Sequence, residues 1–210
     1  APFRRALRVY EACGRRESEE YANTLRGMGY VRRKEERYEE ADTLYKQAQE
    51  VYATCVGRES VAYAYTLDGL GYVQLGQQRY EEALTLFEEA LRICVVCEGR
   101  ESVAYADILH SKGELRQEQQ RYEEAVAVFE EALTTTRKFL GDEHTHTVFL
   151  LNAYEKAKLL LQEQQSKSRN ERVPQRASSP HSVYTHGGRL LWQLTALAAL
   201  LALAVGSRRA

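Results

Sequence analysis

The sequence predicts an all-α protein: a right-handed superhelical solenoid of antiparallel helix pairs, followed by a C-terminal transmembrane helix. The first observation is a repeat with a period of 42 residues: the pattern of residues 59–100 returns immediately as 101–142, and residues 17–58 are a looser copy. A fixed period in this range is typical of one supersecondary unit stacked on itself. The second observation is that all three prolines lie outside the repeats, at Pro2, Pro174 and Pro180. A long proline-free region rich in Ala, Leu, Glu and Arg favours helix throughout.

Each repeat divides into two helices joined by a short connection. In the middle copy we expect a first helix over residues 61–75 and a second over residues 80–94, because apolar residues recur there at helical spacing. Glu81 and Glu82 open the second helix, where the helix dipole favours acidic side chains. Ser60 and Ser102 precede first helices and are interpreted as N-caps. Gly99 suits the turn that ends the unit.

Small and large residues alternate at fixed positions of the repeat. Gly29, Gly71 and Gly113 share one position, although glycine inside a helix costs about 1 kcal/mol relative to alanine. We expect these glycines to let two helices approach closely. The large residues that fill the space beside them occupy another shared position: Tyr45, Phe87 and Phe129.

The cysteines do not predict disulfides or a metal site. Cys13, Cys55 and Cys97 lie 42 residues apart, at one equivalent position of successive units. Stacked helices place equivalent residues about 10 Å apart, whereas a disulfide needs Cα atoms within about 7 Å. Cys94 and Cys97 form a Cys-x-x-Cys pair with no second pair nearby, so no zinc site is expected.

These repeated residues resemble the tetratricopeptide repeat. The resemblance is carried by Leu-x-x-Leu-Gly, then Tyr-Glu-Glu-Ala, an aromatic residue and Ala-Leu, over residues 1 to about 165. The unit of 42 residues is similar to the longer variant found in kinesin light chains. The chain departs from the family at Arg32, Gln74 and Arg116, where an aromatic residue is usual, and at Thr145, where proline is usual.

The resemblance gives a division of the chain. Residues 1–16 match the second helix of a truncated repeat, and 17–58, 59–100 and 101–142 are three full repeats. Residues 143–165 form a half repeat whose helix, roughly 147–165, caps the stack. Residues 166–188 are rich in Ser, Pro, Gly and Arg and are predicted to be a basic flexible linker, and 189–207 hold the transmembrane tail.

In this family the first helices of the repeats line a groove that binds a peptide or protein. Carried over by position, the resemblance implies the following partner-binding residues: Asn23, Arg26, Tyr30, Arg33, Tyr65, Asp68, Tyr72, Asp107, His110, Glu114, Asn152 and Lys156, with Leu75, Gln117 and Phe149 beside them. One end is basic, at residues 32–34, and the other is acidic, at Glu114 and Glu118. A peptide with charges of both signs would be complementary, and the tyrosines would anchor its apolar side chains. A purely solvated helix face remains the alternative.

A chaperone-tail clamp is disfavoured, because Tyr30 and Tyr72 stand where that family subtype needs asparagine. The sequence predicts neither an enzyme nor a cofactor site, since it holds no phosphate loop and no nucleophile elbow. His144 and His146 are interpreted as a surface pair rather than metal ligands. The net charge of −1 gives no general attraction to nucleic acid.

The C-terminal region contains an uncharged apolar run that begins at Leu190 and ends at Gly206, between Arg189 and Arg208. Three interpretations are open: a tail anchor holding the repeats on the cytoplasmic face of a membrane, a lipid-anchor signal, or an incidental apolar segment. We expect the first. The predicted function is therefore a non-catalytic adaptor that binds a partner in a repeat groove at a membrane. The alternatives are a soluble kinesin-light-chain-like cargo adaptor fragment and a regulatory subunit of an enzyme assembly.

Overall fold

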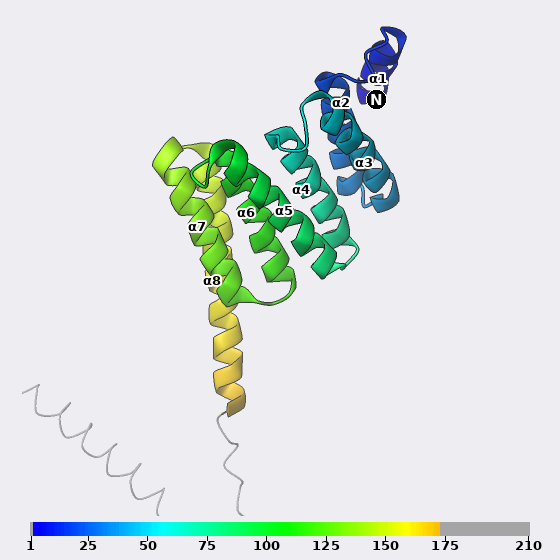
Figure 1. The fold of residues 1–210 in the computed structure, drawn as a ribbon. Helices are drawn as coiled ribbons and strands as arrows, with labels where there is room; N and C mark the ends of the chain where they lie inside the picture. The colour runs from blue at the N-terminus through cyan, green and yellow to red at the C-terminus, as the bar shows by residue number, and fades with distance from the viewer. Residues whose placement is uncertain (1, 173–210) are drawn as a thin grey trace, which may run out of the picture. The chain divides into compact units, whose positions relative to one another are not determined.

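The computed structural model describes residues 2–172, and within this range every regular element is a helix. Figure 1 shows the helices in chain order, from blue at the N-terminus to yellow. Their bounds are α1 Pro2–Ala12, α2 Glu19–Lys34, α3 Tyr38–Cys55, α4 Val61–Gly76, α5 Tyr80–Glu98, α6 Val103–Glu118, α7 Tyr122–Leu140 and α8 Thr145–Arg172. The expectation of an all-α repeat array is confirmed. The predicted transmembrane tail at 189–207 and most of the linker at 166–188 lie outside the described residues.

The helices pack as consecutive hairpins, α2 with α3, α4 with α5, and α6 with α7. Each hairpin also contacts the next, through α3 with α4 and α5 with α6. The first helices α2, α4 and α6 touch one another in sequence, whereas α3 and α5 make no comparably close backbone contact within the described part. The first helices therefore form a continuous layer, and the second helices stand further apart.

Serine caps begin the first helices, as the sequence predicted for two of them. Ser60 Oγ accepts a hydrogen bond from the backbone N–H of Tyr63 at 3.3 Å, and Ser102 Oγ accepts from Tyr105 at 3.1 Å. Ser18 caps α2 in the same way. Because these side chains satisfy backbone groups that a helix start leaves free, each contributes about 1 kcal/mol.

The predicted contact between glycine and ring is confirmed. A Cβ atom added at Gly71 would lie 2.5 Å from the ring of Phe87, and one added at Gly113 would lie 2.5 Å from Phe129. At Gly29 the corresponding distance to Tyr45 is 3.2 Å. The two helices of each hairpin can therefore approach this closely only because these positions carry no side chain.

The same rings also join one hairpin to the next. Tyr45 on α3 packs on Gly69 of α4, where an added Cβ would lie 2.3 Å from the ring. Phe3 on α1 occupies the equivalent position one period earlier, and its ring lies 2.9 Å from a Cβ built on Gly27. Helix α1 thus packs on α2 in the way that α3 packs on α4.

The second helices are longer than predicted. Helix α5 continues to Glu98 rather than ending at residue 94, and its last four residues are exposed. It ends where Gly99 adopts a φ of 85°, a conformation that favours glycine. The last helix begins at Thr145 and extends to Arg172, beyond the predicted residues 147–165.

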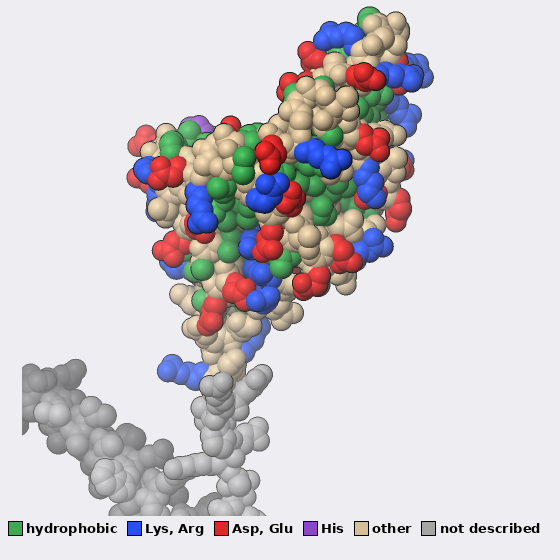
Figure 2. All heavy atoms as spheres, in the orientation of Figure 1, with side chains coloured by type: hydrophobic (Ala, Val, Ile, Leu, Met, Phe, Trp, Pro, Cys, Tyr) green, Lys and Arg blue, Asp and Glu red, His purple; other side chains and the backbone are tan. Residues whose placement is uncertain are grey.

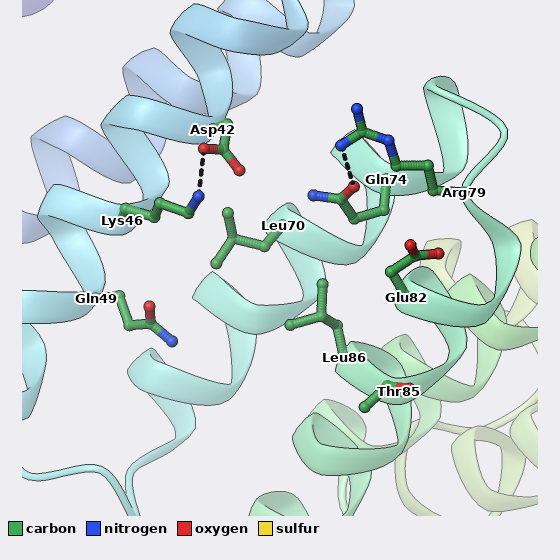
Figure 3. A pocket seen from close by; sticks show the side chains of 9 residues that line it. All are labelled: Asp42, Lys46, Gln49, Leu70, Gln74, Arg79, Glu82, Thr85 and Leu86. Carbon is green, nitrogen blue, oxygen red and sulfur yellow. Dashed lines mark hydrogen bonds and ion pairs between the residues drawn. The ribbon is translucent and has the colours of Figure 1, made fainter.

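The wider spacing of α3 and α5 leaves an outer pocket of about 580 Å³ over α4 (Figure 3). Leu70 and Leu86 lie at its floor. On its rim, Arg79 Nη1 donates a hydrogen bond to Gln74 Oε1 at 3.3 Å. One period later Arg116 replaces Gln74 and lies 3.3 Å from Glu124. The other residues lining the pocket are Asp42, Lys46, Gln49, Glu82 and Thr85.

Most of the buried apolar side chains belong to one cluster that runs from α4 to α8, including Phe87, Ile108 and Leu150. A smaller cluster joins α2 and α3 around Leu25 and Tyr52. On the face shown in Figure 2, basic and acidic side chains are interspersed between hydrophobic ones. Among the described helices, none has the length and apolar character needed to cross a lipid bilayer.

Candidate functional site

Helices α2, α4 and α6 line a groove of about 830 Å³. Because the first helices form a continuous layer, residues at one repeat position come to lie along a single surface. The groove is lined by ten of the residues predicted from the sequence: Asn23, Arg26, Tyr30, Arg33, Tyr65, Asp68, Tyr72, Asp107, His110 and Glu114. Phe149 of α8 lies at one end of it, and Phe3 of α1 also lines it.

Two predicted residues of α8 lie elsewhere. Lys156 lines an adjoining hollow of about 360 Å³ together with Leu75, Gln117 and Glu118. This hollow shares Arg33, Tyr72 and Glu114 with the groove, so the two are continuous. Asn152 is exposed and lines neither of them.

Tyrosine–carboxylate bonds join α4 to α6 along the groove. The Tyr65 hydroxyl donates to Asp107 Oδ2 at 2.7 Å, and the Tyr72 hydroxyl donates to Glu114. Burial, reinforced by these carboxylates, raises the pKa of both tyrosines. Both hydroxyls therefore stay protonated and bonded. Tyr65 and Tyr72 form part of the groove wall, and their hydroxyls are not free to bond a partner. The most exposed aromatic side chains that line the groove are Tyr30 and Phe149, each 51% exposed.

Arginines stack on the tyrosine rings at the α2 side of the groove. The guanidinium carbon of Arg33 lies 4.4 Å from the ring centre of Tyr72 and 5.2 Å from that of Tyr30. Arg26 lies 5.7 Å from the ring centre of Tyr65. Such a cation–π contact stabilises the orientation of the guanidinium group by about 0.5–1 kcal/mol. Neither Arg26 Nε nor Arg33 Nε has an acceptor among the described residues.

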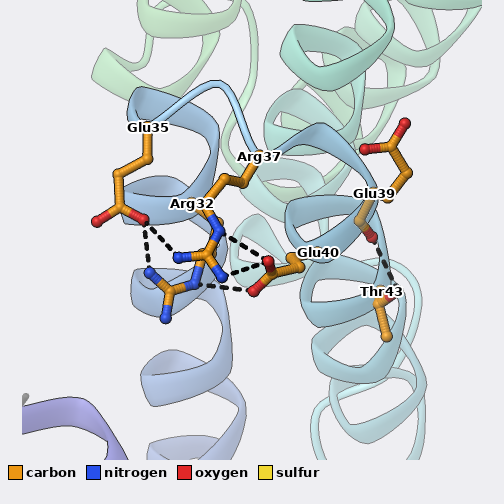
Figure 4. A network of polar contacts seen from close by, with 6 residues as sticks. All are labelled: Arg32, Glu35, Arg37, Glu39, Glu40 and Thr43. Atoms are coloured by element: carbon orange, nitrogen blue, oxygen red, sulfur yellow. Dashed lines mark hydrogen bonds and ion pairs between the residues drawn. The ribbon is translucent and has the colours of Figure 1, made fainter.

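Arg32 does not belong to this basic end, contrary to the sequence interpretation. It lies 2.5 Å from Glu35 and 3.2 Å from Glu40, in the network between α2 and α3 shown in Figure 4. Arg37 also pairs with Glu40. Because the side chains of successive helix residues point about 100° apart, Arg32 lies on the face of α2 toward α3 and Arg33 lies on the groove face. Lys34, by contrast, lines the groove.

Asp68 occupies the middle of the groove. Its Oδ1 atom is enclosed and accepts no hydrogen bond from the described residues. Burial raises the pKa of this carboxyl to about 7, against the opposing effects of the Ser111 hydroxyl and of Arg33. Asp107 and Glu114 on α6 add to the increase. The ionised form of this carboxyl is therefore disfavoured, and a nearby cation or hydrogen-bond donor would stabilise it.

Histidines close the α6 end of the groove. His146 Nε2 lies 2.9 Å from Asp107 Oδ1, and the His110 ring centre lies 4.7 Å from that of Phe149. Burial lowers the pKa of His110, so this ring is neutral at pH 7. Sequence reasoning treated His146 as a surface residue; its contact with Asp107 depends on how α8 packs, which no repeat position reveals.

The described residues contain no group of side chains that could hold a metal ion. Cys13, Cys55, Cys94 and Cys97 are free thiols, and of these Cys94 is buried. Burial raises the pKa of the Cys94 thiol to about 12, which makes it a poor nucleophile.

The tetratricopeptide repeat family model matches residues 20–94 and 104–170. This chain belongs to the tetratricopeptide repeat family. The resemblance in the sequence is therefore confirmed. No curated protein sequence matches the chain significantly.

Several solved structures share the fold. BtubC (BKLC) from P. vanneervenii is 17% identical, with a TM-score of 0.58 over 88% of this chain and 81% of its own. A Podosopora anserina putative kinesin light chain with nearly identical TPR-like repeats is 16% identical, with a TM-score of 0.58 over 80% of this chain and 79% of its own. Aspartyl phosphate phosphatase F from Bacillus subtilis is 16% identical, with a TM-score of 0.52 over 73% of this chain and 41% of its own.

Proposed function

We propose that this tetratricopeptide repeat protein is a non-catalytic scaffold that binds an extended segment of a partner protein in the groove of α2, α4 and α6. The observation that carries the proposal is the groove itself, which has aromatic walls and charges of both signs. Backbone groups of an extended segment can bond such polar side chains, while its side chains contact the rings.

The charge pattern favours a polypeptide over nucleic acid. Arg26 and Arg33 at one side of the groove face Asp68, Asp107 and Glu114 at the other. A nucleic acid backbone is uniformly negative and would be repelled by the acidic part, whereas a peptide can carry both signs.

The groove assignment is tested by selecting random twelve-residue peptides, displayed on phage, for binding to the 210-residue chain. We expect the selected peptides to lose most of their affinity for a Tyr30→Ala variant, because Tyr30 and Phe149 are the most exposed aromatic side chains that line the groove and only Tyr30 lies on its α2 wall. The matched control is Phe139→Ala on α7, since Phe139 has the same exposure of 51% and lies outside the groove. Equal binding by both variants contradicts the assignment.

We also propose that the chain is tethered to the cytoplasmic face of a membrane through the run from Leu190 to Gly206. The support is the sequence alone, an uncharged run long enough for a short span and flanked by Arg189 and Arg208. A chain lacking residues 189–210 is expected to move from the membrane fraction to the soluble fraction on cell fractionation. If the truncated chain still sediments with membranes, the tether is disproved.

The likeness in fold to a putative kinesin light chain favours a second candidate, a soluble cargo adaptor. The same fractionation separates the two candidates, since a soluble adaptor leaves the full 210-residue chain in the soluble fraction.

A further inference from the structure

We infer that the groove selects a partner segment with a lysine or arginine side chain that binds Asp68, and with an acidic side chain that faces Arg26 and Arg33. This inference rests on the proposed function, because it names the chemistry of the segment that the groove holds.

The main support is the state of Asp68. Its Oδ1 atom is enclosed in the groove wall and has no hydrogen-bond donor within the described residues. Buried polar atoms are almost always bonded, and an unpaired carboxylate oxygen is more costly than an unpaired neutral group. A ligand ammonium or guanidinium in the groove beside this carboxylate supplies the opposite charge.

The neighbours of Asp68 make this position acidic overall. From α6, Asp107 and Glu114 face it across the groove and disfavour its ionisation. Both already receive hydroxyl hydrogen bonds, from Tyr65 and Tyr72. A cation bound beside Asp68 would therefore be attracted by three carboxylates at once.

One cation of the chain opposes this attraction. Arg33 on α2 favours the ionised form of Asp68, but the stacking of Arg33 on Tyr72 directs it toward the ring. No ion pair joins Arg33 to Asp68 in the described part of the chain. The remaining groups that face Asp68 are neutral: Tyr45 on α3, Tyr65 and Tyr72 on α4, Cys94 on α5 and Ser111 on α6.

The second half of the inference comes from the α2 side. Arg26 Nε and Arg33 Nε are enclosed donors without acceptors among the described residues. Both guanidinium groups are held in place by tyrosine rings. Guanidinium groups held in this way bind carboxylates well, because little side-chain freedom remains to be lost.

A bound metal ion is the other ligand that three carboxylates could attract. The described residues contain no set of acidic, histidine or cysteine side chains close enough to coordinate one ion. A flexible lysine or arginine side chain needs only one close carboxylate, with the others acting at longer range.

The test uses peptides selected on phage with the 210-residue chain, synthesised with their basic residue intact or changed to methionine. We expect the peptides that depend on Tyr30 to carry a lysine or arginine, and the change to methionine to weaken binding about tenfold to hundredfold. Asp68→Asn is expected to weaken binding of the basic peptide by a similar factor and to leave the methionine peptide unchanged. Asp42→Asn on α3, outside the groove, is the matched control.

The pH dependence provides a second readout. Because the pKa of free Asp68 is about 7, its carboxylate is fully available above that pH and is lost as the pH falls through it. The basic peptide should therefore bind more tightly at pH 8 than at pH 6, and Asp68→Asn should remove most of this difference.

The outcomes distinguish the two proposals. Peptides that depend on Tyr30 but carry no basic residue, or that bind equally well with methionine, overturn this inference and leave the groove as a binding site. If no selected peptide depends on Tyr30, the proposed function fails and the inference fails with it.

Discussion

Asp68 contributes a pH-dependent cost to folding even without a partner. Its pKa is about 7 in the folded chain, above the value of about 4 expected in an unfolded chain. Between these values the folded state binds more protons, so the stability contributed by protonated Asp68 is present at low pH and decreases as the pH rises.

We therefore expect the wild-type chain to lose up to about 1 kcal/mol of unfolding free energy, relative to Asp68→Asn, between pH 6 and pH 8. Urea denaturation of both proteins at the two pH values measures this difference. All other titrating groups are common to the two proteins and largely cancel. A wild-type-minus-variant difference that does not change with pH would show that Asp68 titrates normally.

At the scale of single residues, the sequence predicted positions on a repeating helix better than it predicted contacts between helices. Tyr30, Asp68 and Glu114 line the groove because a fixed repeat position projects onto a fixed face. Asn152 does not line it, although Phe149 of the same helix does, because the packing of α8 leaves Asn152 exposed outside the groove. The enclosed Oδ1 of Asp68 could not be foreseen either, since it depends on contributions from α2, α4 and α6 together.

At the scale of the helix, the packing of an aromatic ring against a glycine recurs in three hairpins, but the space available for an added methyl group differs between them. Phe87 and Phe129 are fully buried and lie only 2.5 Å from a Cβ added at Gly71 or Gly113. At Gly29 the ring of Tyr45 lies at 3.2 Å, so a methyl group requires a smaller shift.

Gly71→Ala and Gly113→Ala are therefore each expected to destabilise the fold by about 1–3 kcal/mol through overpacking, although alanine is the better helix former. Gly29→Ala is the matched control and is expected to be close to neutral, because the gain in helix propensity of about 1 kcal/mol offsets the tighter contact. Thermal and urea unfolding of the three variants measures the order. Equal effects at all three positions would contradict a role for the ring distance.

The starts of these elements were easier to predict than their ends. Ser60 and Ser102 indicated where first helices begin, because a cap is a local bond between a side chain and the nearby backbone. The apolar pattern that predicted α5 stops at Cys94, whereas the helix continues through four exposed residues until Gly99 adopts a positive φ, so the pattern alone placed the end four residues too early.

At the scale of the whole repeat array, each hairpin is stabilised by its neighbours, so stability should vary along the chain. The largest buried cluster lies on α4 to α8 and includes Phe87 and Leu150, whereas α1 contributes only the partly buried Leu7 to the cluster on α2 and α3. In repeat arrays, local opening is easiest where a unit has a neighbour on one side only.

We therefore expect backbone amides of α4, α5 and α6 to exchange most slowly with deuterium, and those of α1 to exchange fastest among α1 to α7. Phe87→Ala should speed exchange in α4 to α6 more than in α1 and α2, because its ring is fully buried in the large cluster and packs against Gly71 and Tyr72. Exchange followed by mass spectrometry on peptic fragments measures both effects, with Phe139→Ala as the exposed aromatic control. A uniform increase along α1 to α7 would mean that the array opens as a single cooperative unit, and that the hairpins do not differ in local stability.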